Sequence, residues 1–327
     1  MIAFDANRTR AQWIAGIVAA FTAACVLAQG YPNKPIKLIV GFTPGSATDI
    51  TARIFAQKFS EAWAVPVTVE NIPGAGGTVG VNRVAKAQPD GYTLIYAANG
   101  AMTIAPSLQG NLPYDPTRDF APISLLLTMP SIVAVNNEVP AKTFQELIAL
   151  AKARPGKLSY ATPGNGTPQH VAGELLKILA GVDIIHVPYR GAIFTDVIDG
   201  RVTIALQNAG SVLQTVREGK LRGLAVTSLE RSPNMPDLPT ISESGFPGFE
   251  AISWFALLAP AGTPAPIVSK VYQESSKIVA QPDMRARFAQ LGLDTVGKSP
   301  DKLAAVIKSD IDKWARVIKD AGITATE

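Results

Sequence analysis

Short apolar runs alternate with loops and helical stretches along most of this chain of 327 residues. Each run has the length and composition of a buried strand, and the alternation predicts an α/β fold with parallel strands joined by crossovers. The strands are expected at 36–40, 65–70, 92–97, 131–135, 158–161, 184–188, 202–206, 221–228 and 253–258.

Helical periodicity predicts the elements between these strands, at 50–63 (opening at Asp49), 79–86, 143–153 and 170–179. Thr143 is followed three residues later by Glu146, which is the pattern of a capping box. In the helix 170–179, Val171, Leu175 and Ile178/Leu179 fall on one predicted apolar face. The last 25 residues predict a surface helix with an apolar stripe made of Leu303, Ile307, Ile311, Trp314 and Ile318.

The elements form two α/β units, and the segment from about Ser253 is expected to return to the first of them. We therefore expect one lobe from residues 29–129 plus 253–327 and a second lobe from 130–252. A chain of this length commonly holds more than one domain.

The first 28 residues have the order of a secretory signal peptide. Arg8 and Arg10 precede an uncharged stretch, 13–28, that ends in small residues and predicts cleavage near Ala28. Sixteen residues fall short of the roughly 20 that a membrane-spanning helix needs. An uncleaved anchor and a lipid on Cys25 are the alternatives. The sequence therefore predicts an exported, periplasmic protein.

Composition excludes several kinds of chemistry from the exported chain. Its single cysteine, Cys25, lies in the predicted signal peptide, so disulfides, thiolate metal sites and a cysteine nucleophile are not expected. Two histidines argue against a histidine-rich metal site. A net charge of +4 without a basic run is not the pattern of a nucleic-acid-binding protein.

Motifs of enzymes and nucleotide-binding proteins are also missing from the sequence. The glycine-rich segment 74–80 resembles a dinucleotide fingerprint but has the wrong spacing, with Val79 where the third glycine should stand. There is no P-loop, no Gly-x-Ser-x-Gly elbow and no His-Glu-x-x-His. The sequence gives no reason to expect a cofactor, a metal or catalysis.

Three segments share the design of an anion site: 41–49, 163–168 and 189–192. In each, a strand ends, a loop rich in small residues follows, and a helix begins. Ligands of open α/β sheets bind at the carboxyl ends of the strands, where free N–H groups and the dipole at a helix start favour an anion. Two such loops from opposite lobes could hold one carboxylate without a lysine.

Single residues in these loops allow more than one interpretation. Asp49 is most simply an N-cap, which is compatible with ligand contact. His170 is a cap, a packed ring or a ligand contact, and Arg190 is a solvated charge or a carboxylate partner. His186 lies in an apolar strand and is interpreted as structural. Phe42 is interpreted as core or cleft wall.

Longer stretches resemble one known family over nearly the whole exported chain. They are YPNKPIKLIVGFTPGSATDITAR, VENIPGAGGTVG, AKAQPDGYTL, FQELIALAKARPGKLSYATPGNGTPQHVAGELL, HVPYRG, VREGKLRGLAVTS and WFALLAPAGTPAPIV. In this order they are similar to the extracytoplasmic solute receptors of tripartite tricarboxylate transporters, the Bug receptors.

The resemblance implies a two-lobed, type II (Venus-flytrap) periplasmic binding protein with a mixed or parallel sheet flanked by helices in each lobe. It implies a monomer without enzyme activity or cofactor. A small carboxylate (a di- or tricarboxylate, an aromatic acid or an amino acid) would bind between the lobes and pass to an inner-membrane permease. The ligand-binding residues it implies are Phe42, Thr43, Pro44, Gly45, Ser46, Asp49, Asn99, Gly164, Asn165, Gly166, Thr167, His170, Tyr189, Arg190, Gly191 and Asn208.

The sequence departs from the family pattern in three places. The loop from Gly191 to Asp196 is shorter than usual, Gln207 stands where the family commonly has an aspartate, and the run 43–47 differs from the usual Pro-Ala-Gly-Gly type. These departures leave the identity of the ligand open. A ligand-binding adaptor that signals to a membrane sensor kinase is the alternative function. A hydrolase or a dehydrogenase is a third, but the sequence has neither a nucleophile elbow nor a dinucleotide fingerprint.

Overall fold

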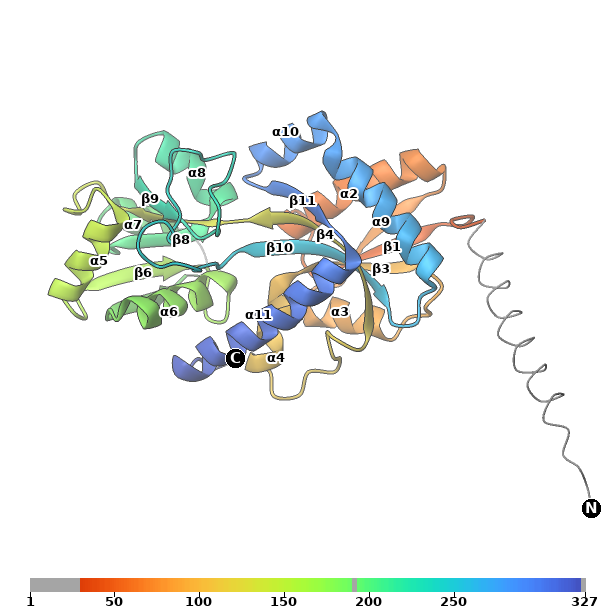
Figure 1. Cartoon of the computed structure of the whole chain (residues 1–327), viewed down its shortest axis with the longest axis horizontal. Coiled ribbons are helices and arrows are strands. Elements are labelled where there is room, and N and C mark those ends of the chain that lie inside the picture. The colour runs from red at the N-terminus through yellow and green to blue at the C-terminus, as the bar shows by residue number, and fades with distance from the viewer. Residues whose placement is uncertain (1–29, 190–192, 325–327) are drawn as a thin grey trace, which may run out of the picture.

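The protein consists of two α/β lobes, each built around its own sheet (Figure 1). The computed structural model describes residues 30–189 and 193–324. The predicted signal peptide and two predicted site residues, Arg190 and Gly191, lie outside the described residues. The expected fold class, a two-lobed α/β protein with helices flanking mixed sheets, is confirmed.

The sheet of lobe 1 has six strands in the order β11-β4-β10-β3-β1-β2. They are β1 (Ile36–Val40), β2 (Val67–Asn71), β3 (Thr93–Ala98), β4 (Phe120–Met129), β10 (Ser253–Pro260) and β11 (Asp294–Lys298). β1 pairs in parallel with β2 and β3, whereas β10 is antiparallel to both β3 and β4. The parallel half follows from strand–helix alternation, and the returning segment adds the antiparallel half.

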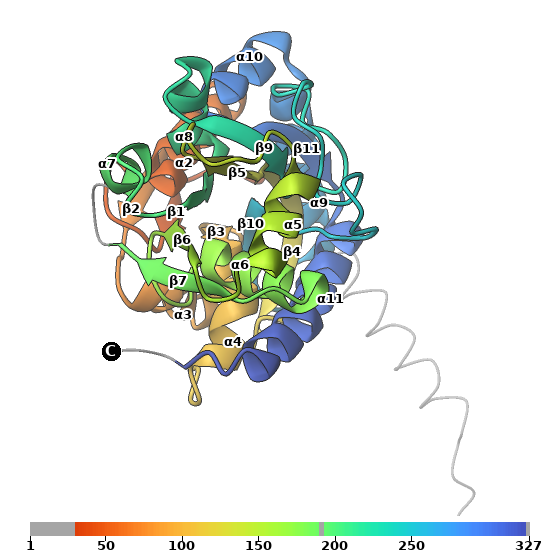
Figure 2. The ribbon, with the colours of Figure 1, turned by 90° about the vertical axis from the view of Figure 1, so that its left-hand side faces the viewer.

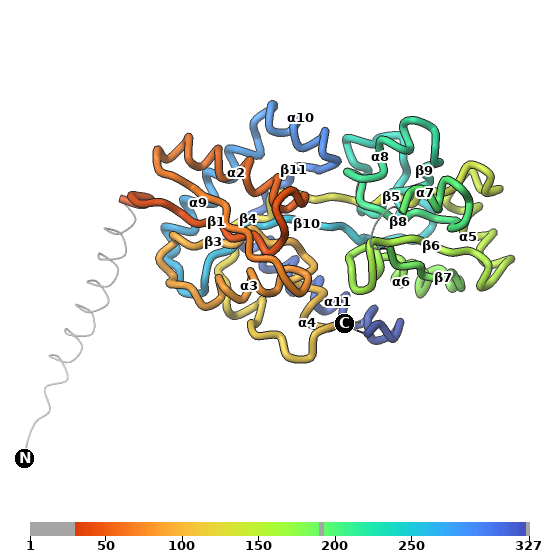
Figure 3. Tube along the Cα trace, turned by 180° about the vertical axis from the view of Figure 1, so that it is seen from behind, coloured from red at the N-terminus to blue at the C-terminus, as the bar shows by residue number. Residues whose placement is uncertain are grey.

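The sheet of lobe 2 has five strands in the order β7-β6-β8-β5-β9. They are β5 (Ser131–Val135), β6 (Leu158–Thr162), β7 (Ile184–Pro188), β8 (Ile204–Asn208) and β9 (Arg222–Val226). β6 is parallel to β7 and β8, and β5 is antiparallel to β8 and β9. In both lobes the carboxyl ends of the parallel strands face the region between the lobes (Figure 3).

Strand β1 shows why an almost continuous apolar run forms a central strand. Leu38 and Val40 contribute to the core on one face of the sheet, and Ile39 contributes to the core on the other. Because successive side chains of a strand point to opposite faces, a strand covered by helices on both sides must be apolar at nearly every position. Lys37 is the exposed exception.

Helices cover both faces of each sheet (Figure 2). In lobe 1, α2 (Ala47–Trp63), α9 (Ala265–Ala280) and α10 (Pro282–Gln290) cover one face, and α3 (Thr78–Ala85) covers the other with η2 (Gly100–Ile104). The short segments η1 (Ala75–Gly77) and α4 (Ala105–Leu108) contact η2. In lobe 2, α5 (Phe144–Ala153) and α6 (Pro168–Ala180) lie opposite α7 (Ile193–Ile198) and α8 (Ala209–Arg217).

The last helix, α11 (Pro300–Asp320), runs across both lobes. Leu303 and Ile307 in its first half belong to a core of lobe 1, whereas Trp314 and Ile318 belong to a core of lobe 2. The predicted helix and its apolar stripe are confirmed. The strong period of the stripe predicts the helix but not that two different cores share it.

Several elements differ from those predicted. The strands β4 and β11 and the helices α8, α9 and α10 were not expected. In α6, Val171 is buried and Leu175 packs against the core as predicted, but Ile178 and Leu179 are 44% and 53% exposed, so the predicted apolar face is wrong at its C-terminal end. The buried stripe runs through Ala172, Leu176 and Ala180, because alanine packs closely against a sheet although it contributes little to an apolar pattern.

The capping box is confirmed, with the Thr143 hydroxyl accepting from the Glu146 N–H and the Glu146 carboxylate accepting from the Thr143 N–H. None of the helices within residues 30–324 that the structure describes is long and apolar enough to cross a membrane. The same residues contain no group of three or more His, Cys, Asp or Glu side chains that could hold a metal ion.

Candidate functional site

The helix α2 of lobe 1 begins with a tight hydrogen-bonded loop. Ser46 is its N-cap, and the Ser46 hydroxyl accepts from the Asp49 N–H at 3.2 Å. The Asp49 carboxylate reaches back and accepts from the Gly45 N–H at 2.9 Å. Gly45 has a φ of 83°, a backbone conformation that favours glycine. The prediction that Asp49 is the N-cap is therefore wrong, because the helix begins earlier and Ser46 takes that place.

Asp49 is buried and fully engaged within lobe 1. Its carboxylate also accepts from the Arg53 guanidinium and, at 2.8 Å, from the Asn71 amide at the end of β2. Burial by itself raises the pKa of Asp49, but the hydrogen bonds from Arg53, Gly45 and Asn71 outweigh it and hold the pKa below its ordinary value. Asp49 is an ionised support of the loop.

The helix α6 of lobe 2 begins in the same way. Thr167 is the N-cap, and its hydroxyl accepts from the His170 N–H at 3.3 Å. The Nδ1 atom of His170 accepts from the Gly166 N–H at 3.0 Å. Gly166 has a φ of 69°. An accepting Nδ1 requires a neutral imidazole with its proton on Nε2.

The ring of His170 lies under this loop and is only 7% exposed. It stacks on His186 of β7 with ring centroids 3.9 Å apart, and His186 Nε2 lies 2.6 Å from the Thr162 hydroxyl. Burial lowers the pKa of His170, with Glu174 opposing the shift. Burial, followed by His170 and Lys177, lowers the pKa of His186 to about 4. Both rings are therefore neutral at pH 7, and the packed interpretation of both histidines fits their geometry.

A cavity of about 620 Å³ lies between the two loops, which we call the main cavity. Its walls come from both lobes and from β10 between them. The lining includes Ala47 and Thr48 at the start of α2, and Pro168 and Gln169 at the start of α6. Phe42, Ile104, Leu108 and Phe255 form apolar parts of the wall.

The first turns of α2 and α6 supply hydrogen-bond donors to this cavity. The first N–H groups of a helix have no carbonyl partner within it. At α2 these are the N–H groups of Ala47 and Thr48, and at α6 the N–H group of Gln169, since Pro168 has none. With the positive ends of two helix dipoles, these donors favour an anion between the lobes.

Asn208, at the end of β8, joins lobe 2 to the strand β10. Its Oδ1 accepts from Gln169 Nε2 at 2.5 Å, from the Ser253 hydroxyl at 3.3 Å and from the Ser131 hydroxyl at 3.4 Å. Ser131 and Ser253 lie where the chain passes between the two sheets. Three donors to one oxygen fix the orientation of the amide and leave its Nδ2 as a donor at the cavity wall.

Asn99, at the start of η2, contributes a buried acceptor to the same wall. Its Nδ2 donates to the Ile252 carbonyl at 3.2 Å, which fixes the amide orientation. Its Oδ1 is buried and has no hydrogen-bond partner among the described residues. A donor on a ligand or a water molecule would satisfy it.

The predicted site residues separate into those that line the main cavity and those that support it. Phe42, Asn99, Asn165, Gly166, Thr167 and Asn208 line it. Thr43, Pro44, Gly45, Ser46, Asp49, Gly164, His170 and Tyr189 are not part of its lining. Asp49 and His170 shape the two loops from behind, and the Tyr189 hydroxyl donates to Asp196 at 2.6 Å. Ligand contact by any of these residues stays a prediction.

Several lining residues were not predicted, among them Ala47, Thr48, Gln169, Ser253 and Phe255. A signal for the helix-start residues was present, because free N–H groups belong to the first turn after a cap rather than to the cap itself. No local pattern marks Ser253 or Phe255, which reach the cavity only because β10 returns to lobe 1.

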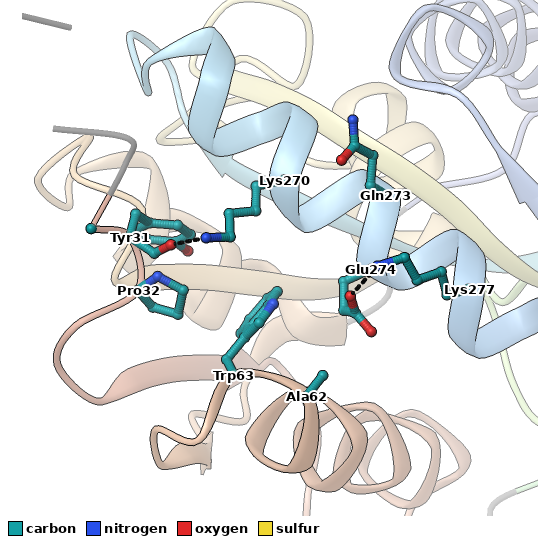
Figure 4. A pocket seen from close by; sticks show the side chains of 9 residues that line it. Tyr31, Pro32, Ala62, Trp63, Lys270, Gln273, Glu274 and Lys277 are labelled. Carbon is teal, nitrogen blue, oxygen red and sulfur yellow. Dashed lines mark hydrogen bonds and ion pairs between the residues drawn. The ribbon is translucent and has the colours of Figure 1, made fainter. Parts of the chain in front are cut away.

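A different hollow lies on the outer side of lobe 1, at the opposite end of α2 from the main cavity (Figure 4). Tyr31 and Trp63 line it together with residues of α9. Its charged groups are already engaged, since Lys270 donates to the Tyr31 carbonyl and Lys277 pairs with Glu274. It also lacks a helix start, so the main cavity is the better candidate for a ligand site.

Several related proteins have about the same length and the same fold as this chain. Protein BugT from Bordetella pertussis is 35% identical over 321 residues, which cover 97% of this chain and 98% of BugT. A solved structure of an R. palustris protein with adipate is 32% identical, with a TM-score of 0.76, covering 90% of this chain and 99% of that one.

A second solved structure, MatC from Rhodopseudomonas palustris with bound malate, is 33% identical. Its TM-score is 0.72, and the match covers 88% of this chain and 100% of MatC. Residues 51–323 match the family described as "Tripartite tricarboxylate transporter family receptor". This chain therefore belongs to the receptor family of the tripartite tricarboxylate transporters, whose members are periplasmic solute-binding proteins.

Proposed function

We propose that this protein is an exported, non-catalytic receptor that captures a small organic carboxylate between its lobes and delivers it to a tripartite tricarboxylate-type permease in the inner membrane. One observation carries the proposal: the starts of α2 and α6, from opposite lobes, line the same cavity. Donors from both lobes would then contact one anion, so binding and lobe closure would be coupled.

The chemistry of the lining supports a carboxylate as the ligand. Backbone N–H groups at two helix starts and the amide of Asn208 are donors that suit carboxylate oxygens. The related receptors were solved with adipate and with malate, which are both carboxylates. Delivery to a permease is supported by membership of the family, and the N-terminal pattern of a signal peptide supports export.

The test is ligand binding by the protein purified from the periplasm of an expression host. Thermal unfolding is measured with adipate, malate, citrate, hexanoate, benzoate, glutamate and the uncharged amides hexanamide and benzamide. A bound acid at about one hundred times its dissociation constant stabilises the fold by about 2.7 kcal/mol. We expect a clear rise for at least one acid and none for its amide. A flat result for every acid would contradict the proposal.

A pair of variants of one helix locates the binding site. Ala47→Glu places a negative charge at the start of α2, inside the main cavity, and we expect the affinity for the acid to fall at least about a hundredfold. Ala62→Glu introduces the same charge at the other end of α2, outside the cavity, and is the control. Equal affinities of the two variants would show that the acid binds elsewhere.

A further inference from the structure

A smaller chamber of about 290 Å³ adjoins the main cavity. Ala47 and Asn208 line both spaces, so the chamber begins at the point where the first turn of α2 and the end of β8 approach one another. Its walls are largely apolar and include Ile50, Met129, Leu291 and Leu293. We call this space the second chamber.

The second chamber lies between the lobes, because its walls come from both. Ile50 and Leu291 belong to lobe 1, and Gly210 in the first turn of α8 belongs to lobe 2. The two sides touch through backbone atoms, since a Cβ atom added to Gly210 would lie only 2.4 Å from the Leu291 carbonyl oxygen. Figures 1 and 3 show α8 and α10 facing one another across the lobes at this place.

Side-chain hydrogen bonds hold the lobes together next to this contact. Asp294 at the start of β11 accepts from the Ser232 hydroxyl at 2.9 Å and from the Asn234 amide at 2.7 Å. Ser232 and Asn234 follow β9 of lobe 2. The chamber is therefore a closed-lobe feature: separation of the lobes would take Gly210 away from Leu291 and open it to solvent.

The lack of charged side chains around the two spaces limits the number of charged groups that the ligand can carry. None of the described residues that line the main cavity or the second chamber carries a charged side chain. The backbone donors at the starts of α2 and α6 lie in the main cavity, where they suit one carboxylate. A second carboxylate in the second chamber would lose its water against Ile50, Leu291 and Leu293, which offer no hydrogen bond in return. The hydroxyls of Thr51 and Ser211 in the same wall already donate to backbone carbonyls, so the amides of Asn208 and Gln290 are the side-chain donors that remain there.

We propose that the ligand carries a single carboxylate and an apolar body, and that the apolar body occupies the second chamber. This inference rests on the proposed function, because the carboxylate is held at the two helix starts. It assigns discrimination between monocarboxylates and dicarboxylates to the walls of the second chamber rather than to a charged side chain. Ile50, which is 41% exposed, would be covered by the apolar body.

The test is a series of straight-chain acids measured by calorimetry. From propanoate to hexanoate, we expect the affinity to rise about fourfold for each methylene that enters the chamber. Adipate has the chain length of hexanoate and a second carboxylate, and we expect it to bind at least tenfold more weakly than hexanoate. Benzoate and terephthalate form a second matched pair with the same expected order.

Variants with the same substitution test the place of the apolar body. Ile50→Trp fills the second chamber, so we expect the rise in affinity with chain length to disappear. Ile185→Trp on the edge strand β7 is the control, because Ile185 is similarly exposed (51%) and lies outside both spaces.

The results separate the inference from the proposed function. If adipate binds as tightly as hexanoate, or if Ile50→Trp keeps the rise with chain length, the inference is overturned and the carboxylate receptor stands. If none of the acids binds, both are overturned. A rise with chain length that Ile50→Trp alone removes, together with weak adipate binding, supports the inference.

Discussion

The start of α2 in lobe 1 and the start of α6 in lobe 2 share one backbone design. In each, a hydroxyl N-cap (Ser46 or Thr167) accepts from an N–H group three residues later. That later residue, Asp49 or His170, in turn accepts from the N–H of a glycine with positive φ. The next two residues after each cap line the main cavity.

The two loops differ in the chemistry of the acceptor. In lobe 1 it is a carboxylate, paired with Arg53 four residues later and with the amide of Asn71 on the neighbouring strand. In lobe 2 it is a neutral imidazole, with Glu174 four residues later and the ring of His186 on the neighbouring strand. The comparison teaches that the backbone shape of the site does not depend on the acceptor, whereas its response to pH does.

Removing the acceptor of lobe 1 should have the largest effect. Asp49→Ala leaves the Gly45 N–H, the Asn71 amide and the Arg53 guanidinium without their shared partner, and we expect a loss of about 3 kcal/mol in the free energy of unfolding. Urea denaturation measures it. Asp49→Asn keeps an acceptor for Gly45 and should lose less. Equal losses for both variants would mean that the charge, rather than the hydrogen bond, supports the loop.

Acidification should affect lobe 2 before lobe 1. The folded pKa values of His170 and His186 lie below their ordinary 6.5, so the unfolded chain binds more protons in this range. The stability that the two neutral histidines contribute is complete above about pH 6.5. It is lost as the pH falls through the pKa values of the folded protein, and that of His186 is about 4. Asp49, with a folded pKa below 3.8, keeps its contribution to a lower pH.

At pH 5 we therefore expect a lower unfolding temperature and weaker carboxylate binding than at pH 7. The loss of stability should be smaller than that caused by Asp49→Ala and larger than that caused by removing a single cap. A protonated Nδ1 of His170 would point a second donor at the Gly166 N–H. Glu174 and Lys177, which form an ion pair with one another, act on the His170 ring with opposite signs, Glu174 raising its pKa and Lys177 lowering it. His170→Asp copies lobe 1 and should reduce the dependence. A variant with an unchanged pH profile would exclude His170 as its source.

The caps should give the smallest effects, and effects of the same size. Ser46→Ala and Thr167→Ala each remove one hydroxyl acceptor from an equivalent N–H, and each should cost about 1 kcal/mol in the free energy of unfolding. Ser299→Ala at the start of α11, which does not line the main cavity, is the control for the cost of a cap alone. A much larger loss at one of the two loops would break the equivalence proposed for them.

Local patterns were sufficient to predict much of the fold. The strands 36–40, 131–135 and 184–188 were predicted with the bounds that the structure has, because compact apolar runs bounded by turn residues are unambiguous. The strand β11, with mostly half-exposed residues, has no such run and was missed. Edge strands bury one face at most, so their sequence signal is weak.

The site was predictable as two loops but not as a set of contacts. Glycine-rich loops before helices indicated where donors would lie, and six of the predicted residues line the main cavity. Asp49 was predicted as the cap of α2, but Ser46, three residues earlier, has that place, and both residue types are good caps. Ser253 and Asn208 meet only through the crossing of the chain between the lobes, which no local pattern encodes.

The C-terminal helix α11 has a consequence for the order in which the molecule folds. Its first half completes a core of lobe 1 through Leu303 and Ile307, and its second half completes a core of lobe 2 through Trp314 and Ile318. The packing of lobe 1 therefore requires the chain as far as Ile307, and the packing of lobe 2 requires it as far as Ile318. In the export that we propose for this protein, the late closure of both cores would keep the polypeptide from packing stably while it passes through the membrane.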